Sequence, residues 1–347
     1  MPECRIRTMT DDDLPDVSRV DLAAFSLAAQ RFGGHPIDHG RHRMGLEYFR
    51  RAASDLCIVA DTDGEVIGYG IGHRWGDTAW IGPLGVLPEH MGRGVGTALM
   101  QGFCTRAADG GATVVGLETS IAQNVRIYEK RGFLARGVRL LAARDLGPAV
   151  GAARAGDAAT AGATGRFDPT DGAKVGDFTI LPWGAAGQAR PASRIKEARK
   201  LAGLVTPGLD HTGEFDAVPR SGMGPTYVAL DGADRLAGYA VLHLRAYRSP
   251  GFMDTTPPAD PLVWIMVGSA EATGALLAAC EAAAQAAGAA RLKVPCYGGN
   301  PHAWAVLKQL GYKVDAAFIR MFWRGQYGGT ADRKWGQVPL DLSSWLG

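Results

Sequence analysis

The 347-residue chain has few cysteines, almost no net charge and no long uninterrupted apolar run. Its five cysteines are scattered, odd in number and form no CxxC pair, which suits reduced thiols in a cytoplasm better than a disulfide framework. A net charge of +2 argues against a general nucleic-acid binder. The N-terminal residues MPECRIRTMTDDD contain no apolar signal core. We therefore expect a cytoplasmic protein that binds neither nucleic acid nor a membrane.

The chain is long enough for two domains, and 46% hydrophobic residues allow a substantial core. The Ala-rich stretch from Ala275 is interrupted by Glu281 and Gln285, which predicts a packed helix and not a membrane span. Residues 147–177 are rich in Gly, Ala, Asp and Thr and have almost no large apolar side chains. We interpret them as a linker, with an ordered surface meander as the alternative. The predicted boundaries are a first domain at 1–146, the linker at 147–177, a second domain at 178–327 and a tail at 328–347.

Strands and helices alternate in the first half. The helix after the glycine-rich stretch is indicated by Val95, Leu99 and Phe103, which share one helical face, and it should end at Gly110 and Gly111. The predicted strands are 4–9, a hairpin at 56–75, 78–87, 113–120 and closing strands at 133–146; the predicted helices begin at residues 11, 95 and 122.

The second half repeats this scheme weakly. EVIGYGI at residue 65 is similar to RLAGYAV at residue 235, and RIYEKRGF at residue 126 is similar to AVLKQLGY at residue 305. The two offsets are close to each other, which indicates a duplicated domain with a short insertion. We place that insertion in SPGFMDTTPPAD, residues 249–260.

Gly92, Gly94 and Gly96 follow a predicted strand and lead into a helix. Without Cβ atoms, such a loop lets backbone N–H groups approach a phosphate or pyrophosphate at the helix N-terminus, and Arg93 can add a charge. A P-loop is excluded because Gly96 is followed by Thr97 and no lysine. The spacing GxGxG and the position after several strands disfavour a dinucleotide-binding fingerprint.

The stretches VLPEHMGRGVGTALM and LETSIAQNVRIYEKRGF together resemble the GNAT superfamily of acyl-CoA-dependent N-acyltransferases. The family signature, Arg/Gln-x-x-Gly-x-Gly/Ala, aligns with residues 91–96, with Met91 where the family prefers Arg or Gln. We expect weaker cofactor binding at most. The resemblance implies an α/β (α+β) fold of two GNAT-like domains, each with a mixed, mainly antiparallel twisted sheet flanked by helices. It also implies a pyrophosphate-binding loop for coenzyme A, made of Met91, Gly92, Arg93, Gly94, Val95, Gly96 and Thr97.

The same resemblance assigns roles around the thioester. The strand that ends at Val86 would pair with the pantetheine arm, and the backbone N–H of Val86 or Leu87 would polarise the thioester carbonyl. Asn124 would contact the cofactor arm. Tyr128 would be the general acid, because a phenol is protonated at neutral pH and can donate to a thiolate. The alternative for Tyr128 is a packing role.

The base is open between Glu118 and an ordered water, and a surface ion pair is an equal interpretation of Glu118. Residues 29–49 would cover the acceptor pocket in this family. Their polar residues, His35, Asp38, His39 and His42, match no zinc spacing, so we predict no metal and consider them acceptor contacts or solvated loop residues. Glu47 and Tyr48 are further candidate acceptor contacts.

The second half lacks this machinery. Leu307 takes the place of Tyr128, and MVGSAEATGALLAAC, residues 266–280, has no GxG. It therefore resembles the degenerate second domain of tandem GNAT proteins, and DAAFIRMFWRG, residues 315–325, resembles the closing strand of that domain in one tandem group. We expect it to pack on the first domain and to wall the acceptor pocket. The tail, with Leu340, Leu342, Trp345 and Leu346, is expected to dock on the body.

The sequence thus predicts an N-acetyltransferase that transfers acetyl from acetyl-CoA to a primary amine of a small molecule, as a monomer or homodimer. The alternatives are another acyl group, a hydroxyl or protein acceptor, or a non-catalytic acyl-CoA sensor or scaffold.

Overall fold

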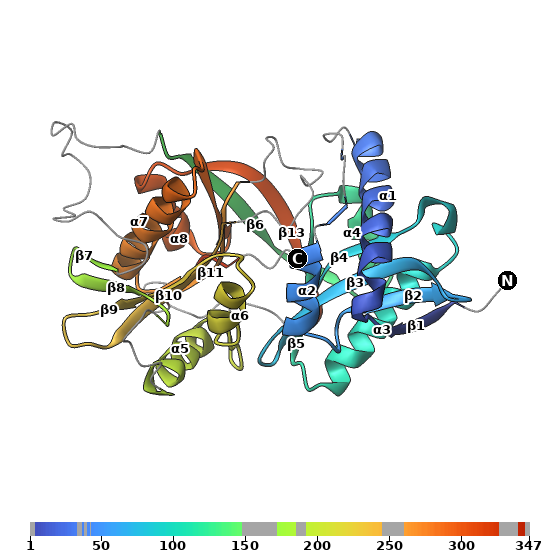
Figure 1. Ribbon diagram of the computed structural model, residues 1–347, viewed down its shortest axis with the longest axis horizontal. Helices are drawn as coiled ribbons and strands as arrows, with labels where there is room; N and C mark the ends of the chain where they lie inside the picture. The colour runs from blue at the N-terminus through green and yellow to red at the C-terminus, as the bar shows by residue number, and fades with distance from the viewer. Residues whose placement is uncertain are drawn as a thin grey trace.

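The computed structural model describes residues 4–32, 37, 40–41, 43–147, 172–184, 192–244, 260–325 and 339–343. Within them, both halves follow one order: strand, two helices, three strands, helix, strand, helix, strand (Figure 1). The first half comprises β1 (Arg5–Thr8), α1 (Leu14–Phe32), α2 (Arg43–Ala52), β2 (Ile58–Thr62), β3 (Glu65–Trp75), β4 (Thr78–Val86), α3 (Val95–Asp109), β5 (Val114–Thr119), α4 (Ala122–Glu129) and β6 (Leu134–Asp145).

The second half comprises β8 (Phe178–Pro182), α5 (Ala192–Val205), α6 (Glu214–Arg220), β9 (Thr226–Leu230), β10 (Leu236–His243), β11 (Leu262–Gly268), α7 (Ala270–Ala286), β12 (Arg291–Tyr297), α8 (Pro301–Gln309) and β13 (Lys313–Arg324). Four short elements lie outside the repeat: η1 (Asp11–Asp13), η2 (Pro88–His90), β7 (Ala173–Val175) and β14 (Leu340–Asp341). The repeated order confirms the internal duplication predicted from the sequence.

Three features differ from the expectations. The helix α2 begins inside the segment 29–49 and ends beyond it, at Ala52. Its apolar side chains Leu46 and Phe49, one turn apart, are both buried, as expected of an amphipathic helix. The closing strands at 133–146 are one unbroken strand, β6, since both of its edges are paired. The stretch 147–177, expected to be a linker, contains β7, which pairs with β8. The expected insertion at 249–260 lies outside the described residues, apart from Asp260.

All of the described strands belong to one sheet, and the two halves exchange their last strands within it. The order is β1-β2-β3-β4-β5-β13-β6-β12-β11-β10-β9-β8-β7, with β14 pairing β11 to the side. The last strand of the second half, β13, therefore lies next to β5, while the last strand of the first half, β6, lies next to β12. Figure 1 shows β6 and β13 crossing the centre of the molecule side by side. Only β4–β5 and β11–β12 are parallel pairs among the described strands.

The helices of the first half cover opposite faces of this sheet. A Cβ added to Gly68 would meet Val95 and Leu99 of α3, at 3.2 and 3.1 Å. The next residue, Tyr69, points the other way and donates a hydrogen bond from its hydroxyl to Asp21 of α1. Hence α3 lies on one face, and α1 lies on the other together with α2, whose Phe49 ring packs on His73 of β3.

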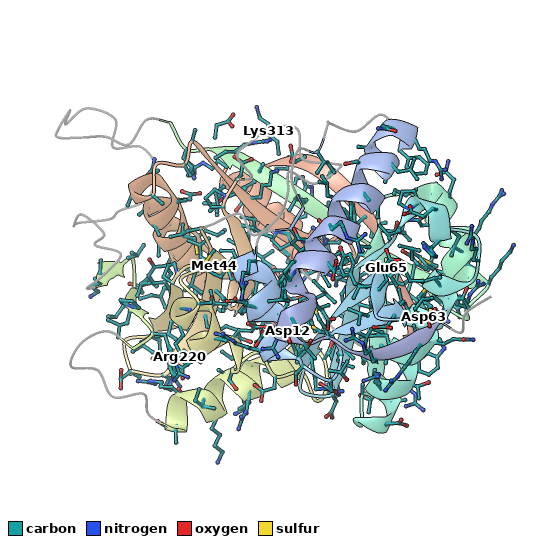
Figure 2. The ribbon with its side chains drawn as sticks, turned by 45° about the vertical axis from the view of Figure 1, so that its right-hand side comes forward. Asp12, Met44, Asp63, Glu65, Arg220 and Lys313 are labelled. Atoms are coloured by element: carbon teal, nitrogen blue, oxygen red, sulfur yellow. The ribbon has the colours of Figure 1, made fainter. Side chains whose placement is uncertain are left out.

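A hydrophobic core runs across the boundary between the halves. It joins Phe49 and Trp75 of the first half with Phe215 and Trp264 of the second. A second core lies under α7 and α8. Met44 on α2 and Arg220 at the end of α6, both labelled in Figure 2, mark the two helices that meet at this boundary. Among the described helices, none is long and apolar enough to cross a membrane.

Candidate active site

The two central strands of the first half separate partway along their length. The parallel pairing of β4 with β5 runs from Thr78↔Val114 to Ile81↔Leu117, although β4 continues to Val86. Just beyond Ile81, two residues of β4, Gly82 and Pro83, lie opposite a single residue of β3, Ile71. This two-to-one pairing is a bulge in β4. Pro83 has no N–H to give to a neighbouring strand. The bulge and the proline together turn β4 away from β5 and open what we name the β4–β5 gap.

The register of β4 distinguishes Val86 from Leu87. Leu87 N–H donates to the Ile67 carbonyl, at 2.9 Å, so this amide is already used within the sheet. Successive N–H groups of a strand point to opposite sides, so the N–H of Val86 points away from β3 and toward the β4–β5 gap. Of the two predicted carbonyl-polarising amides, Val86 has the required direction.

The glycine loop has the backbone shape expected of an anion cradle. Gly92 and Gly94 have φ of 76° and 89°, a left-handed conformation that favours glycine. A Cβ added to either would meet nothing within 4 Å, so the space beside the loop is open. Gly94 is the N-cap of α3, and no side chain caps this helix end, so its first N–H groups remain available to a ligand.

The other loop residues differ in what they present. Met91 is 37% exposed, and Arg93 is exposed. Val95 is buried against the sheet, so only its backbone can contribute to a ligand site. A Cβ added to Gly96 would meet Val86 and Leu84 of β4 at 3.8 and 3.9 Å, which is ordinary van der Waals contact, so packing does not require glycine there.

A basic residue that the sequence analysis did not single out joins the site. Arg131, in the turn after α4, donates from Nε to the Thr97 hydroxyl at 3.2 Å. This bond places a guanidinium beside the first turn of α3, where it adds positive charge to the helix N-terminus. The sequence signal was a lone arginine before Gly132, too common to be chosen on its own.

The acid predicted from the sequence lies on the helix beside the gap. Tyr128 and Asn124 are four residues apart on one face of α4, and both are partly buried. Burial raises the pKa of Tyr128 to about 12, so its hydroxyl is protonated at neutral pH. Its ring packs near Phe133, with ring centroids 6.2 Å apart. The packing role and a proton-donor role are therefore compatible.

Glu118 has a very different environment from that of a typical base. Its side chain is fully buried, and its two oxygens accept hydrogen bonds from Arg139 Nε at 2.5 Å and Arg320 Nε at 2.6 Å. Burial disfavours the charged carboxylate, but the charges and hydrogen bonds of the two arginines outweigh it and hold the pKa below its usual range. Arg139 comes from β6 and Arg320 from β13. Glu118 therefore joins the two exchanged strands to β5, and it is not the surface ion pair considered above.

A second buried carboxylate lies on the α2 face, where the halves meet. Glu214 of α6 accepts hydrogen bonds from the Tyr48 hydroxyl and from Trp75 Nε1, the latter at 2.9 Å. Burial raises the pKa of Glu214, against the effect of these donors. His73 stacks on Trp75, with centroids 5.3 Å apart. Tyr48, predicted as an acceptor contact, thus binds a residue of the second half that the sequence analysis missed.

The remaining candidate acceptor contacts are Glu47 and the polar residues before α2. Glu47 pairs with Arg43 one turn earlier in α2, at 2.7 Å. His35, Asp38, His39 and His42 lie outside the described residues.

The second half has the same fold without the same site. Leu307 stands on α8 where Tyr128 stands on α4, and it is fully buried. Ser269 alone separates β11 from α7, and its side chain accepts from Ala272 N–H at 3.1 Å, so the helix start is capped by its own chain. This confirms that no glycine loop is present at this helix start.

The order of strands and helices is repeated once along the chain, and the glycine loop at a helix start is present in the first copy, so the molecule has a duplicated α/β fold with one such loop among the described residues. The family model for GNAT acetyltransferases matches residues 23–133. L-2,4-diaminobutyric acid acetyltransferase of Nocardia farcinica is 40% identical over 68 residues, which is 19% of this chain. The chain spans about a third (34%) of the length of that curated relative.

Three solved structures extend the likeness to nearly the whole chain. A Pyrococcus horikoshii protein is 16% identical, with a TM-score of 0.62 over 99% of this chain and 95% of that one. A GCN5-related N-acetyltransferase of Sphaerobacter thermophilus is 14% identical, with a TM-score of 0.54 over 93% and 96%. A tandem GNAT protein from the clavulanic acid biosynthesis pathway is 17% identical, with a TM-score of 0.51 over 95% and 100%. Residues 23–133 thus match the model of the GNAT acetyltransferase family, and the chain shares its fold with these structures, a tandem GNAT protein among them.

Proposed function

We propose that the protein transfers an acetyl group from acetyl-CoA to a primary amine of a small molecule, with all of the acyl-transfer chemistry in the first half. The observation that carries this proposal is the open glycine cradle at the start of α3, beside the β4–β5 gap. The name of the curated relative supports an amino-acid amine as the acceptor class.

The residues present suit coenzyme A. The amides at the N-terminus of α3, with Arg93 and Arg131 nearby, provide donors and positive charge for a pyrophosphate. The edge of β4 beyond the bulge can pair with the amides of a pantetheine arm, and Asn124 lies on the helix beside it. Bound there, acetyl-CoA supplies an acyl group that is already activated as a thioester.

The chain's own groups then have three tasks. Val86 N–H donates to the developing oxyanion, which stabilises charge where it forms. The loop and the gap hold the carbonyl next to the incoming amine. The protonated Tyr128 hydroxyl gives its proton to the departing thiolate.

Water is the base in this proposal. Glu118 accepts from two buried guanidinium groups and has a lowered pKa, so a proton on it would be disfavoured and would disrupt both ion pairs. A water that takes the amine proton needs only an open path from the gap to solvent.

The test measures release of free CoA thiol with a panel of amines and amino acids, together with calorimetry of CoA binding. We expect turnover and one CoA site per chain. Gly94→Val should abolish CoA binding, because its side chain would fill the cradle and its φ of 89° opposes any β-branched residue.

Gly64→Val is the matched control. Gly64 has φ of 87° in the β2–β3 turn, and a Cβ there also meets nothing within 4 Å. This variant has similar backbone strain but should bind CoA normally. Binding without any thioester turnover would make the protein a sensor or scaffold, and two equivalent sites would contradict the assignment to the first half.

A further inference from the structure

The second half contains its own gap between central strands. The strand β11 pairs with β12 in parallel at Leu262↔Lys293, whereas β11 continues to Gly268. We name the space beyond this pair the β11–β12 gap. In the repeat, it corresponds to the β4–β5 gap in which the first half is proposed to hold pantetheine.

A segment near the C-terminus lies in this gap. Gly268 pairs with Gly238 of β10 on one edge and with Leu340 of β14 on the other. A strand has only two edges, and β12 is on the same side of β11 as β14. The segment 339–343 therefore runs beside β11 where β12 has turned away, with Leu342 N–H donating to the Met266 carbonyl at 2.8 Å.

The register aligns this segment with the predicted thioester position. In the first half Gly68 pairs with Val86, and in the second half Gly238 pairs with Gly268. Gly268 is thus the counterpart of Val86, and Leu340 lies directly beside it. A peptide strand takes the place in the second half that an acyl-CoA arm would take in the first.

The side chains of the segment fit both faces of the gap. Leu340 and Leu342 are 3% and 0% exposed and belong to the core under α7 and α8. Asp341 pairs with Val267, which in turn pairs with Tyr239, so all three share the opposite face. Asp341 and Ser343 are buried as well. The gap thus accepts an extended peptide with alternating apolar and polar residues.

We propose that the β11–β12 gap is a peptide-binding site and that the chain's own residues 339–343 are its ligand. Main-chain pairing gives the affinity and the two leucine side chains give the selectivity. This inference depends on the repeat and on the register, and it does not depend on acetyl transfer by the first half.

The test uses full-length variants and a labelled synthetic peptide of residues 338–347. Leu342→Asp puts a charge into the apolar core and should release the segment. The peptide, followed by fluorescence anisotropy, should bind this variant at least tenfold more tightly than it binds wild-type protein, whose gap is already filled. A peptide that itself carries Leu342→Asp should not bind.

Leu204→Asp is the matched control, because Leu204 is 46% exposed on α5. It should bind the peptide as weakly as wild type does. If Leu342→Asp is insoluble, Leu342→Ala replaces it, because alanine keeps the site apolar. Leu342→Ala should also bind the peptide more tightly than wild type, by a smaller factor than Leu342→Asp. Equal peptide binding by wild type and the released variant would overturn the proposal. Every variant should bind CoA at one site per chain, with an affinity within twofold of wild type. Loss of CoA binding would indicate a fault in the first half instead.

Discussion

Glu118 offers the sharpest test, because the structure and the sequence assign it different roles. Its carboxylate is fully buried between Arg139 and Arg320, which are 0% and 1% exposed. Replacement by alanine leaves two guanidinium groups in the core without this counter-charge. Removing one partner of a buried ion pair costs about 3–5 kcal/mol. We expect the free energy of unfolding of Glu118→Ala to fall by that amount.

The melting temperature gives the readout. A loss of about 1 kcal/mol lowers it by about 2 °C in a large domain, so Glu118→Ala should melt roughly 6–10 °C lower. Glu65→Ala is the control, because Glu65 is 60% exposed and lies 3.8 Å from Arg19. An exposed pair contributes less than about 1 kcal/mol, so this change should be small.

Glu118→Gln separates structure from catalysis. We expect it to lower stability nearly as much as alanine, because the charge is lost, while kcat at a temperature well below melting stays within a fewfold of wild type. A glutamine variant with wild-type melting and a hundredfold lower kcat would refute the reasoning and make Glu118 the base. The pKa of Glu118 is lowered on folding, so its contribution is complete above the unfolded carboxyl pKa and is lost as pH falls through the folded one. The difference in the free energy of unfolding between wild type and Glu118→Gln should therefore become smaller in acid.

The other predictions concern the remaining buried groups. Tyr128→Phe should keep CoA affinity and lower turnover by roughly 10- to 1,000-fold, and unchanged turnover would leave Tyr128 a packing residue. Tyr48→Phe removes a donor to buried Glu214 and should lower stability by about 1–3 kcal/mol in denaturant titration, whereas an unchanged midpoint would show that the bond contributes nothing. The pKa of Glu214 is raised on folding, so its ionisation in the unfolded chain destabilises the fold as pH rises above the ordinary carboxyl range. Glu214→Gln should therefore gain stability relative to wild type with rising pH, and a constant difference would contradict the raised pKa.

Local patterns in the sequence predicted most of the elements and the cofactor loop. Gly92 and Gly94 could be recognised because their role is set by backbone conformation within a few residues. The repeat could be recognised from Gly68 and Gly238, which both lie where two strands approach closely. Leu307 could be assigned as the counterpart of Tyr128 because it lies four residues before a glycine with φ of 83°.

Long-range pairings could not be predicted in the same way. Whether β6 or β13 lies next to β5 depends on two strands of similar composition that both fit a mainly antiparallel sheet. That choice decides the environment of Glu118, so its pairing with Arg320, 202 residues away, was hidden. The bond between Tyr48 and Glu214 was hidden for the same reason, since the two residues are 166 positions apart.

The strand exchange also sets an order of events during synthesis. The edge of β5, complete at Thr119, is covered by β13, which ends at Arg324. At about 5–20 residues per second, a ribosome needs roughly 10–40 s to make the intervening chain. During that time the first half has an open strand edge that can pair with another chain. A nascent chain stalled or cleaved before β13 is therefore an aggregation hazard.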